Sequence, residues 1–224
     1  MIRTLFAFSL LAVLASCSAN YKINGESSIA SLDGKMLFLK AFRNGVPVKL
    51  DSAEVIHGLF SMKGTLDSTE MVMLYMDDQM VMPIVIESGQ LNVQIDNANI
   101  KAEGTPLNDK LYAFFERKKD LDREAETLER KEAQMILNGD DPNQIEDHLN
   151  KESKKLSKEM DSLIEDFITS NYDNVLGPGV FMMLCAPYQV MTPQIEEIVK
   201  KAPESFRNNC LVKDYINHAR GHRD

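Results

Sequence analysis

Hydrophobic and polar residues alternate with a period close to two in the first part of the chain, up to Gly104. Side chains of a strand point alternately to its two faces, so this period predicts β-strands. Gly-containing dipeptides separate the runs, and a spacing of roughly ten residues between turns is typical of an antiparallel sandwich or a partly open barrel. The predicted strands are Tyr21–Glu26, Lys35–Phe42, Val46–Leu50, Ala53–Ile56, Leu59–Lys63, Met71–Met76, Met80–Glu87, Gln90–Ile95 and Ile100–Glu103.

The period changes after Gly104, where apolar residues recur at alternating intervals of four and three. Such a heptad pattern predicts a helix that Thr105 caps and that ends near Leu137. Asp141 caps a second helix, and the short loop between the two requires an antiparallel hairpin. The apolar faces are Leu107, Leu111, Phe114, Leu121, Ala125, Leu128 and Met135 in the first helix, and Ile145, Leu149, Leu156, Met160, Leu163, Phe167 and Ile168 in the second.

Shorter helices are predicted for the remaining chain. Gly177-Pro178-Gly179 indicates a break before a short buried helix over Val180–Tyr188. Two further helices are expected, one ending at Lys201 and one at about Ala219. The predicted fold class is therefore α+β: an N-terminal antiparallel β-sandwich or open barrel (residues 17–104), a long antiparallel helical hairpin (105–171) and short C-terminal helices (172–224).

Residues 1–16 have the pattern of an export signal. Arg3 precedes an apolar run of about eleven residues, whereas a membrane-spanning helix needs about twenty. Leu14-Ala15-Ser16-Cys17 resembles the lipobox of bacterial lipoproteins. This resemblance implies cleavage before Cys17 and attachment of diacylglycerol and a further acyl chain, such as palmitate, to that residue. The alternative is an ordinary secretory signal followed by an incidental cysteine.

A lipid on Cys17 predicts a cell-envelope protein bound to a membrane through its N-terminal lipid. Ser18-Ala19-Asn20 lacks an acidic cluster of the kind associated with surface display, which favours the periplasmic face of the outer membrane. The formal net charge of −9 repels phosphate backbones, so nucleic acid is not an expected partner. No arrangement of residues indicates catalysis, and we expect no enzyme activity, no cofactor and no metal.

Cys185 and Cys210 leave three interpretations open. In an oxidising compartment they can form a structural disulfide, or Cys185 can be a buried free thiol in an apolar helix. The third interpretation is a redox pair that exchanges with a thioredoxin-like partner. Cys185-Ala186-Pro187-Tyr188 lacks the second cysteine that lowers a thiol pKa in C-x-x-C motifs.

Methionine and histidine offer weaker candidates for metal binding. Met71, Met73, Met80 and Met82 have M-x-M spacings that suit Cu(I), although adaptable core packing is the more ordinary role of methionine. His218 and His222 have a helical metal-ligand spacing, but no third ligand is near them in the sequence. His57 and His148 have no neighbouring nucleophile or carboxylate pair that indicates a triad.

Three motifs carry a resemblance to a known family. The first is Asp51-Ser52 with Val55, Gly58, Phe60 and Gly64; the second is Glu87-Ser88-Gly89 with Gly104-Thr105-Pro106-Leu107-Asn108; the third is Pro203–Asn209. They resemble the domain of unknown function that precedes the thioredoxin domain in Bacteroidetes-type thiol-disulfide interchange (alkyl hydroperoxide reductase/thiol-specific antioxidant-like) lipoproteins, over roughly residues 20 to 218. The sequence contains no C-x-x-C motif, so the resemblance does not extend to reductase chemistry.

These observations predict a lipid-anchored, non-catalytic binding or scaffolding protein that resembles the accessory module of thioredoxin-like lipoproteins. The alternative is a thiol-dependent accessory partner in envelope thiol-disulfide exchange through Cys185 and Cys210. Tyr112 and Phe115 lie beside the heptad seam, so an envelope protein or a second copy of the chain is an expected partner of the hairpin.

Overall fold

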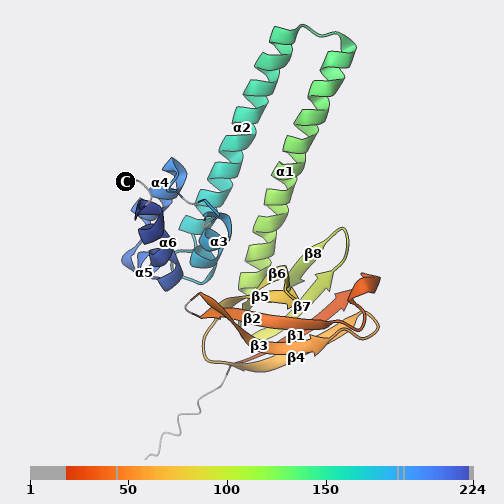
Figure 1. The fold of residues 1–224 in the computed structure, drawn as a ribbon, viewed down its shortest axis with the longest axis vertical. Coiled ribbons are helices and arrows are strands. Elements are labelled where there is room, and N and C mark those ends of the chain that lie inside the picture. Colours follow the sequence, from red (N-terminus) through yellow and green to blue (C-terminus); the bar gives the residue numbers. More distant parts are fainter. Residues whose placement is uncertain (1–18, 44, 186, 189, 222–224) are drawn as a thin grey trace, which may run out of the picture.

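The computed structural model describes residues 19–221 except for residues 44, 186 and 189 (Figure 1). The export signal and Cys17 therefore lie outside the described residues. Eight strands form two four-stranded sheets, and a long helical hairpin and shorter helices follow them. The predicted α+β fold class is confirmed. Within the described residues, no helix combines the length and apolarity needed to cross a membrane.

The first sheet has the strand order β4-β1-β7-β8, and the second has the order β3-β2-β5-β6. All pairings are antiparallel except that between β1 and β7, which is parallel and runs from Tyr21↔Gly89 to Ser27↔Ile95. The strands are β1 (Ala19–Ser27), β2 (Met36–Arg43), β3 (Val46–Glu54), β4 (Leu59–Leu66), β5 (Glu70–Met76), β6 (Gln79–Ile86), β7 (Gly89–Ile95) and β8 (Ile100–Glu103), and a 3-10 turn, η1 (Ala30–Leu32), precedes β2.

The core lies between the two sheets, as the period-two pattern requires. The inward side chains of the second sheet include Leu37, Leu39, Val72, Leu74 and Ile84, and those of the first include Ile23, Met62, Leu91, Val93 and Ile95. Residues between them in sequence point away from the core. The predicted runs Val46–Leu50 and Ala53–Ile56 are joined in β3, because a bulge opposite Leu39 and Lys40 restores the pairing with β2.

Helices α1 (Pro106–Asn138) and α2 (Pro142–Thr169) form the predicted hairpin, here called the arm, which projects away from the sheets (Figure 1). Gly139 ends α1 in the left-handed conformation with φ of 79°, where glycine has no steric penalty. The carboxylate of Asp141 caps α2 by accepting hydrogen bonds from the backbone N–H groups of Asn143 and Gln144.

The C-terminal helices pack beside the base of the arm (Figure 1). They are α3 (Leu176–Cys185), α4 (Pro193–Lys201), α5 (Glu204–Arg207) and α6 (Cys210–Gly221). The predicted break at Gly177-Pro178-Gly179 is wrong, because these residues form the start of α3, where proline lacks only an N–H that has no helical partner. The last predicted helix is divided into α5 and α6 near Asn208.

Candidate interaction surface

Three residues of the first family motif, Asp51, Phe60 and Gly64, make structural contacts in the β domain. A Cβ atom at Gly25 would lie 2.0 Å from Cζ of Phe60, so the ring covers this glycine. The ring of Tyr21 covers Gly64 in the same way, with Cε1 at 2.7 Å from the position of a Cβ atom. The hydroxyl of Tyr21 donates a hydrogen bond to Oδ2 of Asp51 at 3.2 Å. This motif therefore holds β1, β3 and β4 together at one corner of the two sheets.

Three polar residues form a helix clamp between the sheets and the arm: Glu87, Thr105 and Asn108. Asn108 is fully buried, and its side-chain amide bonds both backbone groups of Val85, accepting from N–H at 2.9 Å and donating to C=O at 2.7 Å. Oε1 of Glu87 accepts hydrogen bonds from the backbone N–H groups of Leu107 at 2.8 Å and Asn108 at 3.2 Å. The clamp thus fixes the start of α1 to the end of β6.

Thr105 occupies the N-cap position before Pro106, as predicted, but its side chain makes no capping hydrogen bond to the helix backbone. Its hydroxyl accepts a hydrogen bond from Nδ2 of Asn108 instead of from the helix backbone. The cap is the carboxylate of Glu87, whose negative charge is stabilised by the free N–H groups of a helix N-terminus. Sequence reasoning missed this role because Glu87 is twenty residues from Leu107 along the chain. One turn further on, the hydroxyl of Tyr112 donates to the carbonyl of Pro83 at 2.8 Å.

The outward side of the second sheet carries an apolar surface, here called the β2–β5 face. The register places Phe38 beside Tyr75 and Lys40 beside Met73, and Tyr75 lies beside Met80 on the next strand. Large apolar side chains gathered on a surface mark interaction sites in soluble proteins. The members of this face are Met36, Phe38, Lys40 and Phe42 of β2, Lys49 of β3, Met73 and Tyr75 of β5, and Met80 of β6.

Exposure and charge define the chemistry of the β2–β5 face. Met36 and Phe42 are each 38% exposed, and Met80 is 55% exposed. Nζ of Lys40 lies 4.5 Å from the ring centre of Tyr75 and 5.8 Å from that of Phe38. The rings thus hold a positive charge over an otherwise apolar surface. A second amine, that of Lys49, lies 5.9 Å from the ring centre of Phe38.

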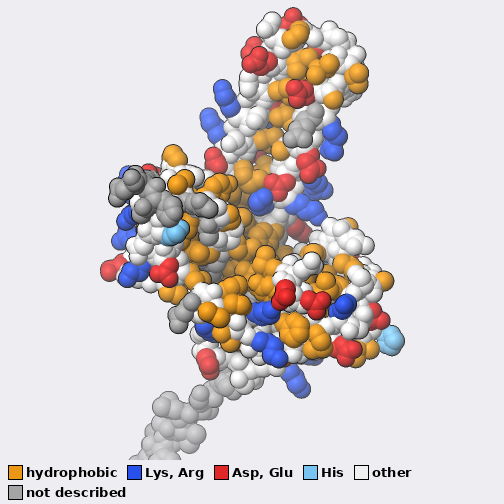
Figure 2. All heavy atoms as spheres, viewed as in Figure 1, with side chains coloured by type: hydrophobic (Ala, Val, Ile, Leu, Met, Phe, Trp, Pro, Cys, Tyr) orange, Lys and Arg blue, Asp and Glu red, His pale blue; other side chains and the backbone are white. Residues whose placement is uncertain are grey.

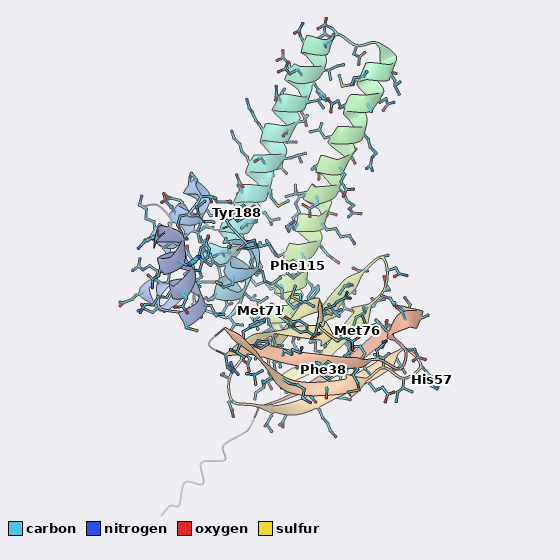
Figure 3. The ribbon with its side chains drawn as sticks, viewed as in Figure 1. Phe38, His57, Met71, Met76, Phe115 and Tyr188 are labelled. Carbon is cyan, nitrogen blue, oxygen red and sulfur yellow. The ribbon has the colours of Figure 1, made fainter. Side chains whose placement is uncertain are left out.

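Helix α3 bounds the β2–β5 face on one side. A Cβ atom at Gly179 would lie 2.1 Å from the sulfur of Met71, so the glycine lets α3 approach β5 closely. Figure 3 shows Met71 where the C-terminal helices approach the sheet and Phe38 further along the same domain. Hydrophobic side chains gather in the region where arm, C-terminal helices and sheets meet (Figure 2).

The methionines considered as copper ligands do not share one face. Met82 lies in the core and is 2% exposed, whereas Met80 lies on the surface. Met71 and Met73 are half-buried on the outward side of β5. Met82 therefore has the core-packing role expected of methionine, and Met80 does not. Across residues 19–221, apart from the masked positions, no group of three or more His, Cys, Asp or Glu side chains is arranged to hold a metal ion.

Cys185 and Cys210 are both free thiols in the structure. Cys185 is buried in α3, and burial raises its thiol pKa to about 12. It is therefore protonated at neutral pH, and a protonated thiol is a poor nucleophile. Cys210, at the start of α6, is exposed.

The histidines lie apart from one another. His57 occupies an exposed turn with φ of 53°, at the far end of the sheets from the arm (Figure 3). His148 lies on α2, where its Nε2 atom is buried without a hydrogen-bond partner. His218 is exposed on α6, and His222, its predicted partner in metal binding, lies outside the described residues.

Residues 21–111 match the model of a family described as a domain of unknown function, DUF4369. The match covers both sheets, the helix clamp and the first turns of α1, while most of the arm and the C-terminal helices lie beyond it. A search of curated proteins found no match. No thioredoxin domain is evident among the described residues. The predicted resemblance to a domain of unknown function is thereby confirmed: this chain contains a DUF4369 domain at residues 21–111.

Proposed function

We propose that this protein is a lipid-anchored, non-catalytic binding or scaffolding protein of the cell envelope that acts as the accessory module of thioredoxin-like lipoproteins does. The β2–β5 face is the observation that carries the proposal. Its exposed Met36, Phe42 and Met80 offer an adaptable apolar surface, because methionine side chains adjust to the shape of a partner.

The chemistry of the β2–β5 face selects the kind of partner. An apolar protein segment covers the exposed methionine and phenylalanine side chains, and removal of this area from water stabilises the complex. Carboxylates at the edge of that segment pair with the amines of Lys40 and Lys49, which lie over the aromatic rings. The partner is therefore a protein segment with apolar side chains and acidic flanks.

The helix clamp supports a scaffolding role. It joins the sheet that carries the β2–β5 face to the arm through the buried Asn108 and through Glu87. The β2–β5 face and the arm therefore keep a fixed relative orientation. Strand β1 begins at the end of the molecule opposite the tip of the arm (Figure 1). A lipid on Cys17 places the sheets at the membrane of the envelope, with the periplasmic face of the outer membrane favoured, and directs the arm away from it.

Site-specific photocrosslinking in native membranes tests this proposal. The full chain carries a photoreactive phenylalanine analogue in place of Phe42, and in the control the analogue replaces Ser61, which is exposed on β4 of the other sheet. We expect one protein partner to crosslink from position 42 and not from position 61. Addition of Lys40→Glu is expected to reduce the crosslink strongly, because it reverses the charge that attracts the acidic flanks.

The folded state of each variant is checked by circular dichroism and thermal unfolding. Equal crosslinking from both positions, insensitivity to Lys40→Glu, or crosslinking only between two copies of this chain would each overturn the proposal. These outcomes concern the sheets alone, since Phe42 belongs to β2 and Ser61 to β4, and neither belongs to the arm.

A further inference from the structure

The two sides of the arm differ in chemistry. A groove runs between α1 and α2 on each side, with volumes of about 560 and 540 Å³. Leu128 and Leu156 line both grooves, so the gap between the helices is open to both sides. The first, the charged groove, is bordered by residues such as Arg117, Asp120 and Lys155. The second, here called the neutral groove, is lined by Leu121, Ala125, Leu149, Ser153, Ser157 and Met160, with Asp122 and Glu132 at its edge.

The heptad seam is only partly buried in the outer half of the arm. Near the sheets, Phe114 packs against Phe167 with ring centres 4.3 Å apart, and Leu121 is 2% exposed. Further out, Leu128 and Leu156 remain half-exposed, and Ala125 is exposed. Two helices alone therefore leave apolar side chains open in the neutral groove, interspersed with the polar side chains of Asn150, Ser153 and Ser157. Its small side chains allow another helix to approach closely.

We propose that the neutral groove packs against the neutral groove of a second copy of this chain. The two arms lie side by side and point in the same direction, which makes a four-helix bundle with a two-fold axis along the arms. In this arrangement α1 of each copy lies opposite α2 of the other, and the half-exposed leucines of both arms form one shared core.

Charge complementarity favours the same-direction arrangement. The ion pair between Arg117 and Glu159 shows which parts of α1 and α2 are level with each other. Asp122 is five residues beyond Arg117, and Lys154 is five residues before Glu159, so these two lie at one level on opposite helices. The two-fold axis brings Asp122, which pairs with Lys118 of its own helix, to the level of Lys154 in the other copy. In the opposite-direction arrangement, α1 faces α1, and Asp122 approaches the acidic residues Glu126 and Glu132 of the other copy.

The available area suits an interface of this kind. About twenty residues of each helix extend beyond the sheets, which gives a length of roughly 30 Å, and two adjacent helices are roughly 20 Å wide. Each copy therefore offers about 600 Å², and the pair buries about 1,200 Å², the lower limit of specific protein–protein interfaces. The charged groove on the other side is lined by fewer apolar side chains.

The association of the full chain, extracted in detergent, is measured by sedimentation velocity. The test variant carries Ser153→Arg and Ser157→Arg, and the control carries Thr127→Arg, an exposed position in the charged groove. We expect the native chain and the control to be dimers. The test variant is expected to dissociate with a dissociation constant raised roughly a hundredfold or more, because two arginines cannot be buried against apolar side chains without large cost.

Unchanged helical content by circular dichroism shows that each variant is folded. A monomeric native chain at the highest concentration attainable would overturn the proposal. Equal dissociation of the test and control variants, or no dissociation of the test variant, would do the same. None of these outcomes depends on the β2–β5 face, so the dimer and the proposed function fail or hold separately.

Cysteine crosslinking in membranes tests the direction of the arms. Ala125 and Ser153 line the same groove, within two residues of one level, so Ala125→Cys in one copy is expected to form a disulfide with Ser153→Cys in another when both are produced together. The background variant Cys210→Ser removes the exposed native thiol and measures any crosslinking through the others. Efficient crosslinking within either single-cysteine population, with none between the two, would overturn the same-direction arrangement.

Discussion

The carboxylate of Glu87 accepts a hydrogen bond at 3.2 Å from the backbone N–H of Asn108, and this contact joins the end of the second sheet to the first turn of α1. Both residues lie within the DUF4369 match, whereas most of the arm lies beyond it. The domain thus contains the fixed base from which the arm extends.

The helix clamp is expected to contribute strongly to stability. Asn108→Leu removes the partner of both backbone groups of Val85, which are buried. Each unsatisfied group costs about 1–3 kcal/mol, so the free energy of unfolding is expected to fall by about 2–6 kcal/mol. Urea denaturation measures it, and Asn217→Ala, at an exposed position on α6, is the control with a change within about 0.5 kcal/mol. A small effect of Asn108→Leu would contradict the structural importance of the clamp.

The contact between Gly25 and Phe60 predicts a non-additive pair of substitutions. Gly25→Ala places a methyl group where the ring lies, and we expect a loss of about 2–3 kcal/mol in the free energy of unfolding. In the Phe60→Ala background the same change is expected to cost much less, because the ring is absent. A double-mutant cycle by urea denaturation measures the coupling. Additive effects would show that the ring does not restrict residue 25.

The raised pKa of Tyr21 predicts a loss of folding stability at alkaline pH. Burial and the neighbouring Asp51 raise its pKa from 10.0 to about 12. The folded state holds the proton of the Tyr21 hydroxyl more tightly than the unfolded state does. The resulting contribution to the free energy of unfolding is complete below pH 10 and is lost as the pH rises through 12. Between pH 8 and pH 11 the native chain should lose more stability than Tyr21→Phe, by at most about 1 kcal/mol for this partly solvated group. Parallel loss in the two proteins would exclude the effect.

The two thiols are expected to differ in reactivity. In the folded protein, maleimide should label Cys210 and leave Cys185 unmodified, because Cys185 is buried and protonated. Denaturation exposes both, and intact mass counts the labels. Cys210→Ser should carry no label before denaturation, apart from any at Cys17. A pair that labels only after reduction is oxidised in the native protein, and this outcome would favour thiol-disulfide exchange or a structural disulfide.

Lipidation predicts a specific N-terminal mass. The N-terminal peptide of protein from native membranes should begin at Cys17 and carry a diacylglycerol group and one further acyl chain. Cys17→Ser should abolish the modification and release the protein from membranes, since acyl chains supply the anchor. A mature N-terminus with an unmodified cysteine would contradict the lipobox interpretation.

Local sequence patterns predicted the positions of the strands and helices better than the contacts between them. The period-two runs located the strands, and the heptads located α1 to within a residue of its end, because each pattern reports which side of an element is buried. Pairing of β1 with β7 and the bulge that continues β3 depend on distant strands. Glu87 stood out only as a motif residue, and its role as a cap depends on the fold that brings it to α1.

The interaction surface was predictable only in part. Core packing was the more ordinary role expected of the methionines in the run Met71–Met76, and α3 packs closely against Met71. The outward side further along is open near Met80, since the C-terminal helices reach only one end of the sheet. The heptad pattern predicted the apolar side chains of the arm, but the difference between its two sides follows from how α1 and α2 face each other.

Strand β1, an inner strand of the first sheet, begins at Ala19, so the sheet starts close to Cys17 in the sequence. Two peptide units separate Ala19 from Cys17 and span at most about 7 Å. A lipid on Cys17 would therefore be joined to the folded domain by a very short linker. With such a lipid, the end of the sheet at Ala19 would stay close to the lipid headgroups, and the β2–β5 face would meet a partner near the membrane surface.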